Sequence, residues 1–360
     1  MKILHVLLSP RAEGTPRLVL DWLSVSSIDQ HILFLYNEPG ELLKYFQSKS
    51  NRINIANIEK RGIIKHLFEI VSVRKLVKSI NPDLVIAWPL SVSQWIHFGA
   101  FLGGCRNLIS HAGNPPAYKG FKERYLFSYI NFWPSRIMNV KIACCSNYIR
   151  EAFHSVPGIP DKMFFSIYNC FNPDRFINKS EPEPNSARKV VMVATLESHK
   201  DHKTLLKAWK FIEQAKPDVE LLLAGNGSLM ESLKSLAMES GLKKIQFLGA
   251  VDNIPDLLWS VDLLVLSTTE NEGFGTVLIE ALAAGLPVIA TDVPACREVL
   301  QGGKFGVLVT PDDPCSLAGA IINSLEKPLS SEQKKSNIDY TSSFTPDRMI
   351  REYLKIVKLS

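Results

Sequence analysis

The sequence predicts an α/β fold with two Rossmann-like, doubly wound domains that face each other across a cleft. Its 360 residues suffice for two domains, and 46% are hydrophobic against 21% charged, as in ordinary globular proteins. Short apolar segments alternate with amphipathic ones along the chain, which is typical of parallel sheets covered by helices. This alternation occurs before and after a polar, proline-rich segment, which indicates two such domains.

The individual elements follow from the apolar segments and the turn residues between them. Predicted strands of the first half are residues 3–8, 32–36, 84–87, 108–111, 141–145 and 165–168, with a helix at 69–80. Predicted strands of the second half are 190–195, 220–224, 245–248, 263–266, 288–291 and 306–309, with helices at 203–213, 229–240 and 276–284. The expected division is a first domain at 1–176, a linker at 177–189, a second domain at 190–344 and a terminal helix within 345–360.

Composition limits the class of protein. No run of about 18 uncharged apolar residues is present, which argues against a transmembrane helix. The apolar start, Met1 to Leu8, lacks a small-residue cleavage site and predicts a strand rather than a signal peptide. The six cysteines are scattered without a Cys-x-x-Cys pair, so we expect buried thiols in a reducing cytoplasm and no structural zinc site.

The net charge of +5 is divided unequally along the chain. Residues 1–180 hold 22 basic and 12 acidic residues, a net of +10, whereas residues 181–360 hold 19 and 24, a net of −5. The basic half suggests an anionic partner such as a membrane surface or a phosphorylated acceptor, and solvated surface charge explains it equally well. Segment 118–134 mixes aromatic and basic residues, which suits either an anionic bilayer or core packing.

Two carboxylates, Glu272 and Glu280, stand eight residues apart around a glycine-spaced turn that precedes an apolar helix. Glycines let the backbone approach a sugar or a phosphate closely, and the helix start offers free N–H groups and a positive dipole end. We therefore expect the two carboxylates to hold different hydroxyls of one nucleotide-sugar ligand. A helix cap and a solvated charge are the alternative interpretation of an isolated pair.

Residues 272–290 resemble the E-x7-E signature of the retaining glycosyltransferases of family four, which have the GT-B fold. The resemblance implies a hexosyltransferase that moves a sugar from a nucleotide diphosphate sugar to a lipid-linked or oligosaccharide acceptor with retained configuration. It implies bacterial cell-surface polysaccharide or glycolipid synthesis, in the cytoplasm or on the inner face of the plasma membrane. Neither a cofactor nor nucleic acid is expected. An Asp-x-Asp motif is absent, so no metal is expected either, and cations should come from side chains.

The same resemblance assigns the catalytic residues. Glu272 would bind hydroxyls of the transferred sugar, Glu280 would bind the ribose hydroxyls, and Lys200 would stabilise the departing diphosphate. Neither glutamate is assigned as a nucleophile, because in this family the leaving phosphate is thought to assist proton removal. His111, at the end of a predicted strand, matches a family histidine that touches the sugar or orients the acceptor, although a lone histidine is often structural.

The remaining donor contacts come from loops that match the family less closely. The arginine that the family places near Lys200 falls on Thr195, so one cationic contact is missing. His199 or Lys203 could replace it, and so could a different geometry of the donor. In the loop after the first strand, Gly14 and Arg17 match the family, but Glu13 stands in place of a family glycine. A plain turn is the alternative interpretation of this loop. Residues 169–176 resemble the family's crossing between domains and are interpreted as structural. The predicted donor-binding residues are Glu280, Gly273, Phe274, Gly275, Thr276, Gly14, Arg17, Thr195, His199, Gly225 and Val251.

Two other functions remain open. A nucleotide-sugar epimerase or hydrolase on a similar fold would use the same site. A catalytically silent nucleotide-sugar binder or partner subunit would follow from the missing cation at Thr195. An NAD dehydrogenase is disfavoured, because no Gly-x-Gly-x-x-Gly follows Leu8 or Ala194.

Overall fold

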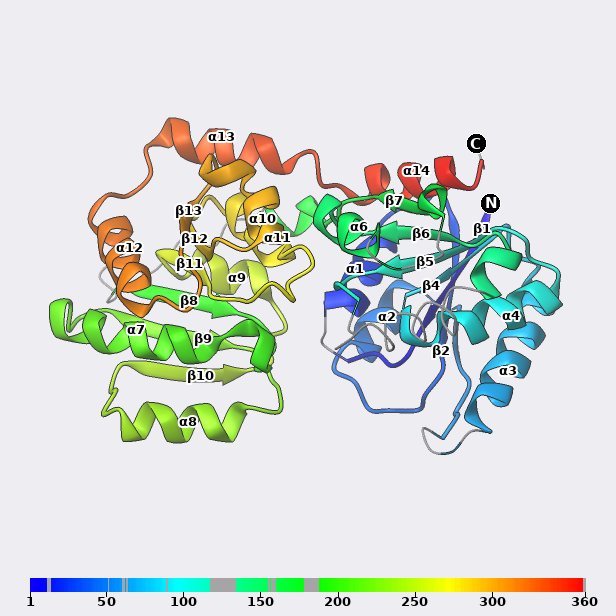
Figure 1. Ribbon diagram of the computed structural model, residues 1–360, viewed down its shortest axis with the longest axis horizontal. Coiled ribbons are helices and arrows are strands. Elements are labelled where there is room, and N and C mark those ends of the chain that lie inside the picture. Colours follow the sequence, from blue (N-terminus) through cyan, green and yellow to red (C-terminus); the bar gives the residue numbers. More distant parts are fainter. Residues whose placement is uncertain are drawn as a thin grey trace. The chain divides into compact units, whose positions relative to one another are not determined.

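The computed structural model divides the chain into two compact units, shown as ribbons in Figure 1. The N-terminal unit contains Met1–Cys170 and Thr345–Ser360, and the C-terminal unit contains Phe171–Phe344. The structure describes residues 1–11, 14–50, 52–59, 62, 64–88, 90–116, 134–154, 156, 160–177 and 188–358. Most of the predicted linker and of the aromatic and basic segment 118–134 therefore lies outside the described residues.

The N-terminal unit is built on a parallel sheet of seven strands. In sequence order they are β1 (Lys2–Leu7), β2 (Asp29–Phe34), β3 (Ile53–Ile55), β4 (Leu84–Ala87), β5 (Leu108–Ala112), β6 (Lys141–Cys144) and β7 (Phe164–Ser166). Their order in the sheet is β3-β2-β1-β4-β5-β6-β7. The strand order therefore reverses between β1 and β4, and in such sheets the loops after the reversing strands part to form a crevice for ligands.

Both faces of this sheet are covered because strand side chains alternate between them. Ile3 and Leu7 of β1 belong to one core and Leu4 and Val6 to the other. The first core includes residues of α1 (Gly14–Trp22), α2 (Leu43–Lys49) and α14 (Pro346–Ile356). The second includes residues of α3 (Lys65–Ile80) and α4 (Ser93–Gly103). A further helix of the unit is α6 (Asn147–His154).

Helices α3 and α4 pack very closely because α4 presents two glycines to α3. A Cβ atom on Gly99 would lie 2.6 Å from the carbonyl oxygen of Ile70, and one on Gly103 would lie 2.6 Å from Cγ1 of Val77. Any larger residue at either position would push the helices apart. The two glycines thus hold α3 and α4 side by side.

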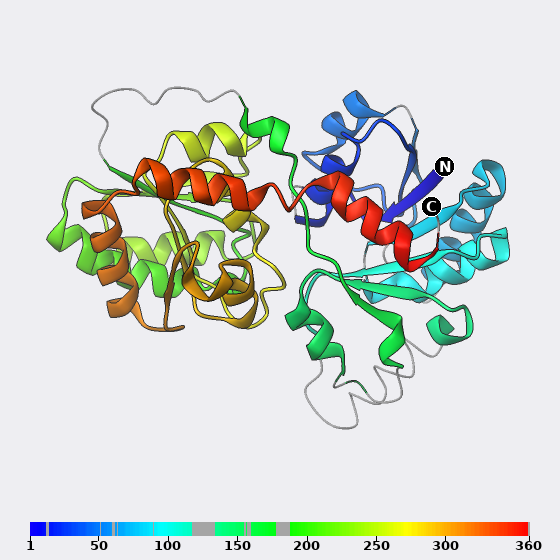
Figure 2. The ribbon, with the colours of Figure 1, turned by 90° about the horizontal axis from the view of Figure 1, so that it is seen from above.

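The C-terminal helix α14 completes the core of the N-terminal unit, over which Figure 2 shows it in red. The side chain of Thr345 caps the helix by accepting the backbone N–H of Arg348. Trp22 Nε1 lies 3.3 Å from the sulfur of Met349, and the ring of Tyr353 packs edge-on against Trp22 with centroids 5.0 Å apart. Residues far apart in the sequence are therefore joined in one aromatic cluster.

The C-terminal unit contains a second parallel sheet, of six strands. They are β8 (Lys189–Val193), β9 (Glu220–Ala224), β10 (Ile245–Gly249), β11 (Leu263–Leu266), β12 (Val288–Thr291) and β13 (Val307–Val309). Their order in the sheet is β10-β9-β8-β11-β12-β13, so the strand order reverses between β8 and β11. The helices are α7 (His202–Ala215), α8 (Met230–Glu239), α9 (Ile254–Trp259), α10 (Thr276–Ala283), α11 (Pro294–Val299), α12 (Pro314–Glu326) and α13 (Ser331–Thr341).

The predicted fold class is confirmed: both units are parallel α/β layers of the doubly wound kind. Each predicted strand is present, with ends that differ by a few residues, and β3 was not predicted. This edge strand has three residues, all only partly buried, so it lacks the continuous apolar run of an inner strand. Helix α3 begins at Lys65, earlier than the predicted start at residue 69. The prediction missed the first turns because their apolar residues face solvent and do not follow the pattern of a helix packed on a core.

The buried aromatic cluster encloses two neutral histidines. Trp88 Nε1 donates to Nδ1 of His5, whose Nε2 faces the amide oxygen of Gln30, so both ring nitrogens of His5 are engaged. Nδ1 of His111 lies 2.8 Å from the hydroxyl of Tyr353. Burial lowers the pKa of His5 to about 3 and that of His111 to about 4.

We expect acid to destabilise the N-terminal unit through these histidines. Their pKa values in the folded protein lie below the ordinary value of 6.5, so the unfolded chain takes up protons first as the pH falls. The stabilisation is complete above pH 6.5 and is lost toward pH 4; His111 alone accounts for about 3 kcal/mol. Urea denaturation between about pH 7 and pH 4 measures the free energy of unfolding, which should fall less steeply with falling pH for His111→Gln than for wild type. His154→Gln, which replaces an exposed histidine, is the control. If the free energy of unfolding depended on pH equally in wild type and in His111→Gln, this account would be contradicted.

Candidate functional site

The predicted site residues of the C-terminal unit gather where the strand order reverses. The short helix η4 (Ser198–Lys200) follows β8, and the loop that carries Glu272 follows β11, the neighbouring strand. Carboxyl ends of adjacent parallel strands meet at one edge of a sheet, and ligands of such folds bind at the reversal point. Lys200 and Glu272 thus meet at the place where this class of sheet builds its sites.

The centre of the site is an ion pair between Lys200 and Glu272. Nζ of Lys200 lies 2.5 Å from Oε2 of Glu272, and the side chains are 17% and 8% exposed. Asp201 follows in the left-handed conformation at φ 42° and caps α7 by accepting the backbone N–H of Thr204. The backbone of Lys200 is therefore fixed at the start of a helix, and its side chain is held by a buried carboxylate.

Glu272 has several partners besides the lysine. Its Oε1 accepts the backbone N–H of Gly275 at 3.2 Å, and its Oε2 lies 3.4 Å from the hydroxyl of Thr268. Burial by itself would raise the pKa of Glu272, but the charge and the hydrogen bond of Lys200 outweigh it and hold the pKa below its ordinary value. Glu272 is therefore an ionised carboxylate that fixes both the lysine and the glycine turn.

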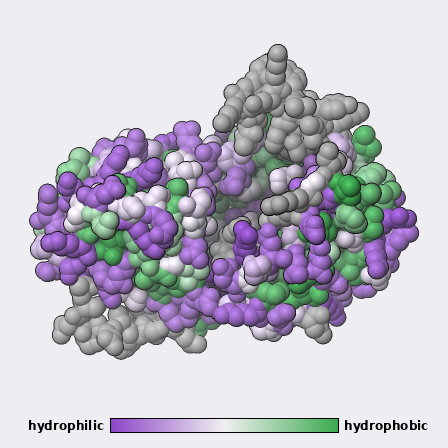
Figure 3. Space-filling view, turned by 90° about the horizontal axis from the view of Figure 1, so that it is seen from below, coloured by the Kyte–Doolittle hydropathy of each residue, from purple (hydrophilic) through white to green (hydrophobic). Residues whose placement is uncertain are grey.

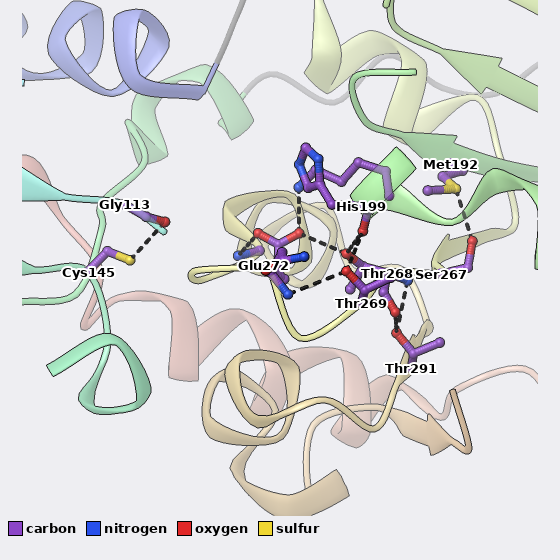
Figure 4. Close-up of polar contacts among 12 residues, drawn as sticks. Gly113, Cys145, Met192, His199, Ser267, Thr268, Thr269, Glu272 and Thr291 are labelled. Atoms are coloured by element: carbon purple, nitrogen blue, oxygen red, sulfur yellow. Dashed lines mark hydrogen bonds and ion pairs between the residues drawn. The ribbon is translucent and has the colours of Figure 1, made fainter. Parts of the chain in front are cut away.

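Main-chain contacts lock the two loops of the site together, as Figure 4 shows. The carbonyl oxygen of His199 accepts the backbone N–H of Thr269 at 3.0 Å and the hydroxyl of Thr268 at 2.9 Å. The hydroxyl of Thr291, at the end of β12, accepts the N–H of Thr268 and donates to its carbonyl oxygen. These threonines were not predicted from the sequence, where their signal is a run of hydroxyl residues directly after a buried strand.

His199 is poorly suited to carry the charge of the missing cation. Burial and the adjacent charge of Lys200 lower the pKa of its imidazole below the ordinary value of 6.5. The imidazole therefore holds a proton less readily than an ordinary histidine, which weakens it as a source of positive charge. Lys203, or a different geometry of the donor, would supply charge in place of the cation expected at Thr195 more readily than this histidine.

The glycine turn before α10 requires its glycine. Gly275 is the N-cap of the helix and adopts φ 78°, a left-handed conformation in which other residues are strained. Gly273 and Phe274 are buried, and the ring of Phe274 contacts that of Phe344 with centroids 5.9 Å apart. Thr276, the first helical residue, is partly exposed. The turn is thus anchored by an aromatic contact, and α10 begins directly after it.

Glu280, on α10, pairs with an arginine that the sequence analysis overlooked. Nη1 of Arg175 lies 3.5 Å from Oε1 of Glu280, and the side chains are 25% and 12% exposed. Arg175 belongs to the short helix η3 (Pro173–Phe176), which Asn172 caps by accepting the N–H of Asp174. The segment was interpreted as structural, yet it supplies a cation to the predicted ribose-binding carboxylate. The sequence signal for Arg175 is an arginine within a short turn that begins with the capping residue Asn172.

The loops after β8 and β9 are in direct contact through glycine. A Cβ atom on Gly225, at φ 145°, would lie 1.9 Å from the carbonyl oxygen of Ala194, next to Thr195. The backbone N–H of Leu196 also donates to the carbonyl oxygen of Asn226 at 3.0 Å. Val251 follows β10, the next strand in the sheet. Three adjacent strands, β8, β9 and β10, are therefore followed by Thr195, Gly225 and Val251. The loop with Glu272 follows β11, the neighbour of β8 on its other side.

Three predicted residues belong to the N-terminal unit. Gly14 is the exposed first residue of α1, and Arg17 lies one turn further along, partly buried. His111 lies on β5 and is 2% exposed, with Nδ1 bonded to Tyr353 and its ring 5.0 Å from that of Trp88. His111 is thus a neutral histidine within the aromatic cluster that holds α14.

Neither a metal cluster nor a membrane-spanning helix is found in the part of the chain that the structure describes. No group of three or more His, Cys, Asp or Glu residues there is arranged to hold a metal ion. Of the adjacent acids after β13, Asp312 accepts the hydroxyl of Thr204 and Asp313 caps α12. Among these same residues, no helix has both the length and the apolar character to cross a bilayer.

We expect the Lys200–Glu272 pair to stabilise the C-terminal unit. Lys200→Met removes one partner of a largely buried pair and should lower the free energy of unfolding by about 3 kcal/mol. Adding Glu272→Gln to it should restore part of that loss, because the remaining carboxylate charge is removed. Urea denaturation measures both values. The control Lys234→Met breaks an exposed pair with Glu231 and should cost less than about 1 kcal/mol. An equal cost for Lys200→Met and Lys234→Met would contradict the pairing.

Comparison with known proteins shows similarity to glycosyltransferases. Residues 173–341 match the family model of glycosyl transferases group 1. The chain is 27% identical to an uncharacterised glycosyltransferase of Methanocaldococcus jannaschii over 61% of its own length and 60% of the archaeal protein. It is 40% identical to a phosphatidyl-myo-inositol mannosyltransferase of Mycobacterium leprae over 35% of its length and 34% of that protein. The chain thus aligns with less than two thirds of each of these relatives.

Solved structures match the chain over nearly its whole length. HepE of Anabaena, crystallised with UDP-glucose, has a TM-score of 0.83 at 18% identity, with 99% of each chain covered. A glycosyltransferase of Rickettsia africae has a TM-score of 0.80 at 19% identity, covering 100% of this chain and 99% of its own. Both units therefore have the Rossmann-like architecture of GT-B structures, and almost all of the C-terminal unit matches the group 1 glycosyl transferase family.

Proposed function

We propose that this protein is a retaining hexosyltransferase that moves a sugar from a nucleotide diphosphate sugar to an acceptor hydroxyl. The observation that carries the proposal is the Lys200–Glu272 pair, placed between β8 and the glycine turn of α10 within the region that matches group 1 glycosyl transferases. HepE of Anabaena was crystallised with UDP-glucose, so UDP-sugars are the donors to test first.

The proposed division of labour follows from the charges of the site. Lys200 and the N-terminus of α10 would stabilise the negative charge of the departing diphosphate, so we propose a reaction that needs no metal and no cofactor. Glu272 keeps Lys200 in place and would accept hydroxyls of the sugar with its remaining lone pairs. Glu280 would accept the ribose hydroxyls. Arg175 lies beside Glu280 and would have to share that carboxylate with the donor.

We expect Glu280→Ala to abolish donor binding, because the ribose hydroxyls would lose their acceptor. Thermal stabilisation by UDP-glucose, UDP-N-acetylglucosamine and GDP-mannose would reveal the donor with the wild-type protein first. Calorimetric titration of that donor then measures its affinity in the variant. Glu239→Ala, which removes an exposed carboxylate of α8, is the matched control and should bind like wild type. Donor affinity unchanged in Glu280→Ala would refute the ribose assignment.

We expect Lys200→Ala to lower turnover by roughly 100-fold, the usual loss when one preorganised donor to a developing negative charge is removed. Chromatography of product formed from a labelled donor and an acceptor measures the rate. Lys207→Ala, an exposed lysine of α7, is the control for a general effect of charge. Turnover of Lys200→Ala equal to that of Lys207→Ala would sink the assignment of Lys200.

A catalytically silent nucleotide-sugar binder is the second candidate. It is favoured by Thr195, which cannot supply the cation that the family resemblance places there, and by the lowered pKa of His199, which makes that residue a weak substitute. Product analysis with and without an acceptor separates the candidates. Binding of donor without transfer to any acceptor supports the silent binder, release of free sugar or an epimer indicates a hydrolase or an epimerase, and a glycosylated acceptor supports the transferase.

The proposed acceptor is a lipid-linked or oligosaccharide hydroxyl of bacterial cell-surface polysaccharide or glycolipid synthesis. The names of the mycobacterial relatives, phosphatidyl-myo-inositol mannosyltransferases, support a lipid-linked acceptor as the first to test. We place the reaction in the cytoplasm, because all six cysteines are free thiols and five of them are buried.

A further inference from the structure

The outer face of α3 and α4 exposes a group of large apolar side chains, visible as green residues at the edge of the N-terminal unit in Figure 3. They are Ile64, the N-cap residue of α3, Leu67, Phe68 and Val71 along α3, and Phe98 and Leu102 along α4, with exposed fractions between 44% and 66%. Along α3 their spacing places them on a single face of the helix, opposite the residues that pack on the sheet. This group forms a patch rather than scattered surface residues.

The two helices present this patch as one rigid surface, which we call the α3–α4 face. Gly99 and Gly103 hold the helix backbones in close contact, as described above. The ring of His66 on α3 stacks on that of Trp95 on α4, with centroids 4.9 Å apart. The apolar residues of both helices are therefore fixed relative to one another before any partner binds.

Basic residues continue the apolar stripe, and exposed acidic residues are missing from both helices. Arg74, Lys75 and Lys78 are exposed in the second half of α3, at helical spacing from Val71. Arg106, just beyond α4, is also exposed, with its guanidinium over the ring of Phe101.

The one carboxylate within the two helices is withdrawn from this surface. Glu69 is completely buried, where it accepts the hydroxyl of Tyr36 at 2.7 Å and pairs with Nδ1 of His66 at 2.8 Å. The solvent side of α3 and α4 is therefore apolar at one end and purely basic at the other.

We propose that the α3–α4 face docks on the surface of an anionic lipid bilayer. Apolar side chains beside lysines and arginines, without acids, match the acyl boundary and the charged headgroups of such a membrane. The core of an interface with a protein partner is usually depleted of charged residues, whereas here three exposed basic residues of α3 adjoin the apolar group directly. The net charge of +10 in residues 1–180 adds to the attraction. The residues of this face do not belong to segment 118–134, and its docking does not depend on the proposed donor chemistry.

The test is co-sedimentation of the full-length protein with vesicles in the absence of nucleotide. Vesicles of phosphatidylcholine with phosphatidylglycerol should bind the protein, and pure phosphatidylcholine vesicles should bind it much more weakly. Binding should fall as salt is raised, because the basic residues act through screened charge.

Two double variants separate the apolar and the basic contributions. Leu67→Gln with Phe68→Gln should reduce vesicle partitioning about tenfold, and Arg74→Gln with Lys75→Gln about 30-fold. Matched controls on the C-terminal unit are Phe211→Gln with Met238→Gln, which removes exposed apolar groups, and Lys207→Gln with Lys210→Gln, which removes exposed charge. Both controls should partition like wild type.

Each other outcome overturns the proposal. Wild-type partitioning of either α3–α4 variant, or equal binding to both kinds of vesicle, would show that this face does not hold anionic lipid. Absence of vesicle binding together with a concentration-dependent dimer that the Leu67→Gln, Phe68→Gln variant abolishes would assign the face to a second copy of the chain. Donor affinity is measured on the same samples, so failure of the proposed transferase activity remains distinguishable from failure of membrane docking.

Discussion

The ion pair between Lys200 and Glu272 is the interaction on which the candidate site depends. It joins the loop after β8 to the loop after β11, and the same carboxylate holds the backbone of Gly275 where α10 begins. A carboxylate buried to this degree is stable only with a cation and several donors, and here it has both. The pair therefore keeps a positive side chain, a helix start and a buried glycine turn in one arrangement before any ligand arrives.

Much of the fold followed from the sequence because inner parallel strands are continuous apolar runs. The elements that were missed or misplaced are not buried on both sides, so they lack such runs. The edge strand Ile53–Ile55 is too short and too exposed to show a pattern, and the first turns of α3 carry Leu67 and Phe68 toward solvent. An apolar pattern reports burial in the chain's own core, so it fails where apolar residues serve the outer surface instead.

The site was predictable only in part. A local motif placed Glu272, Gly275 and Glu280 on a turn and a helix, because those residues are close in the sequence. The partner of Glu280 is 105 residues away, on a segment that resembles a simple crossing between domains. No periodicity or motif links Arg175 to Glu280, and only the folded chain brings them together. Arg175 also brings positive charge to Glu280 from a different segment than the one around Thr195, where the family resemblance places an arginine.

Helix α14 has a consequence for the order in which the chain folds during synthesis. The C-terminal unit is inserted between residue 170 and residue 345, so the N-terminal unit lacks Met349, Ile350 and Tyr353 until the whole inserted unit has left the ribosome. Until then the pocket around Trp22 and His111 has an uncovered side. The C-terminal unit, which is continuous in sequence, can complete its core first, reversing the usual order of folding from the amino end.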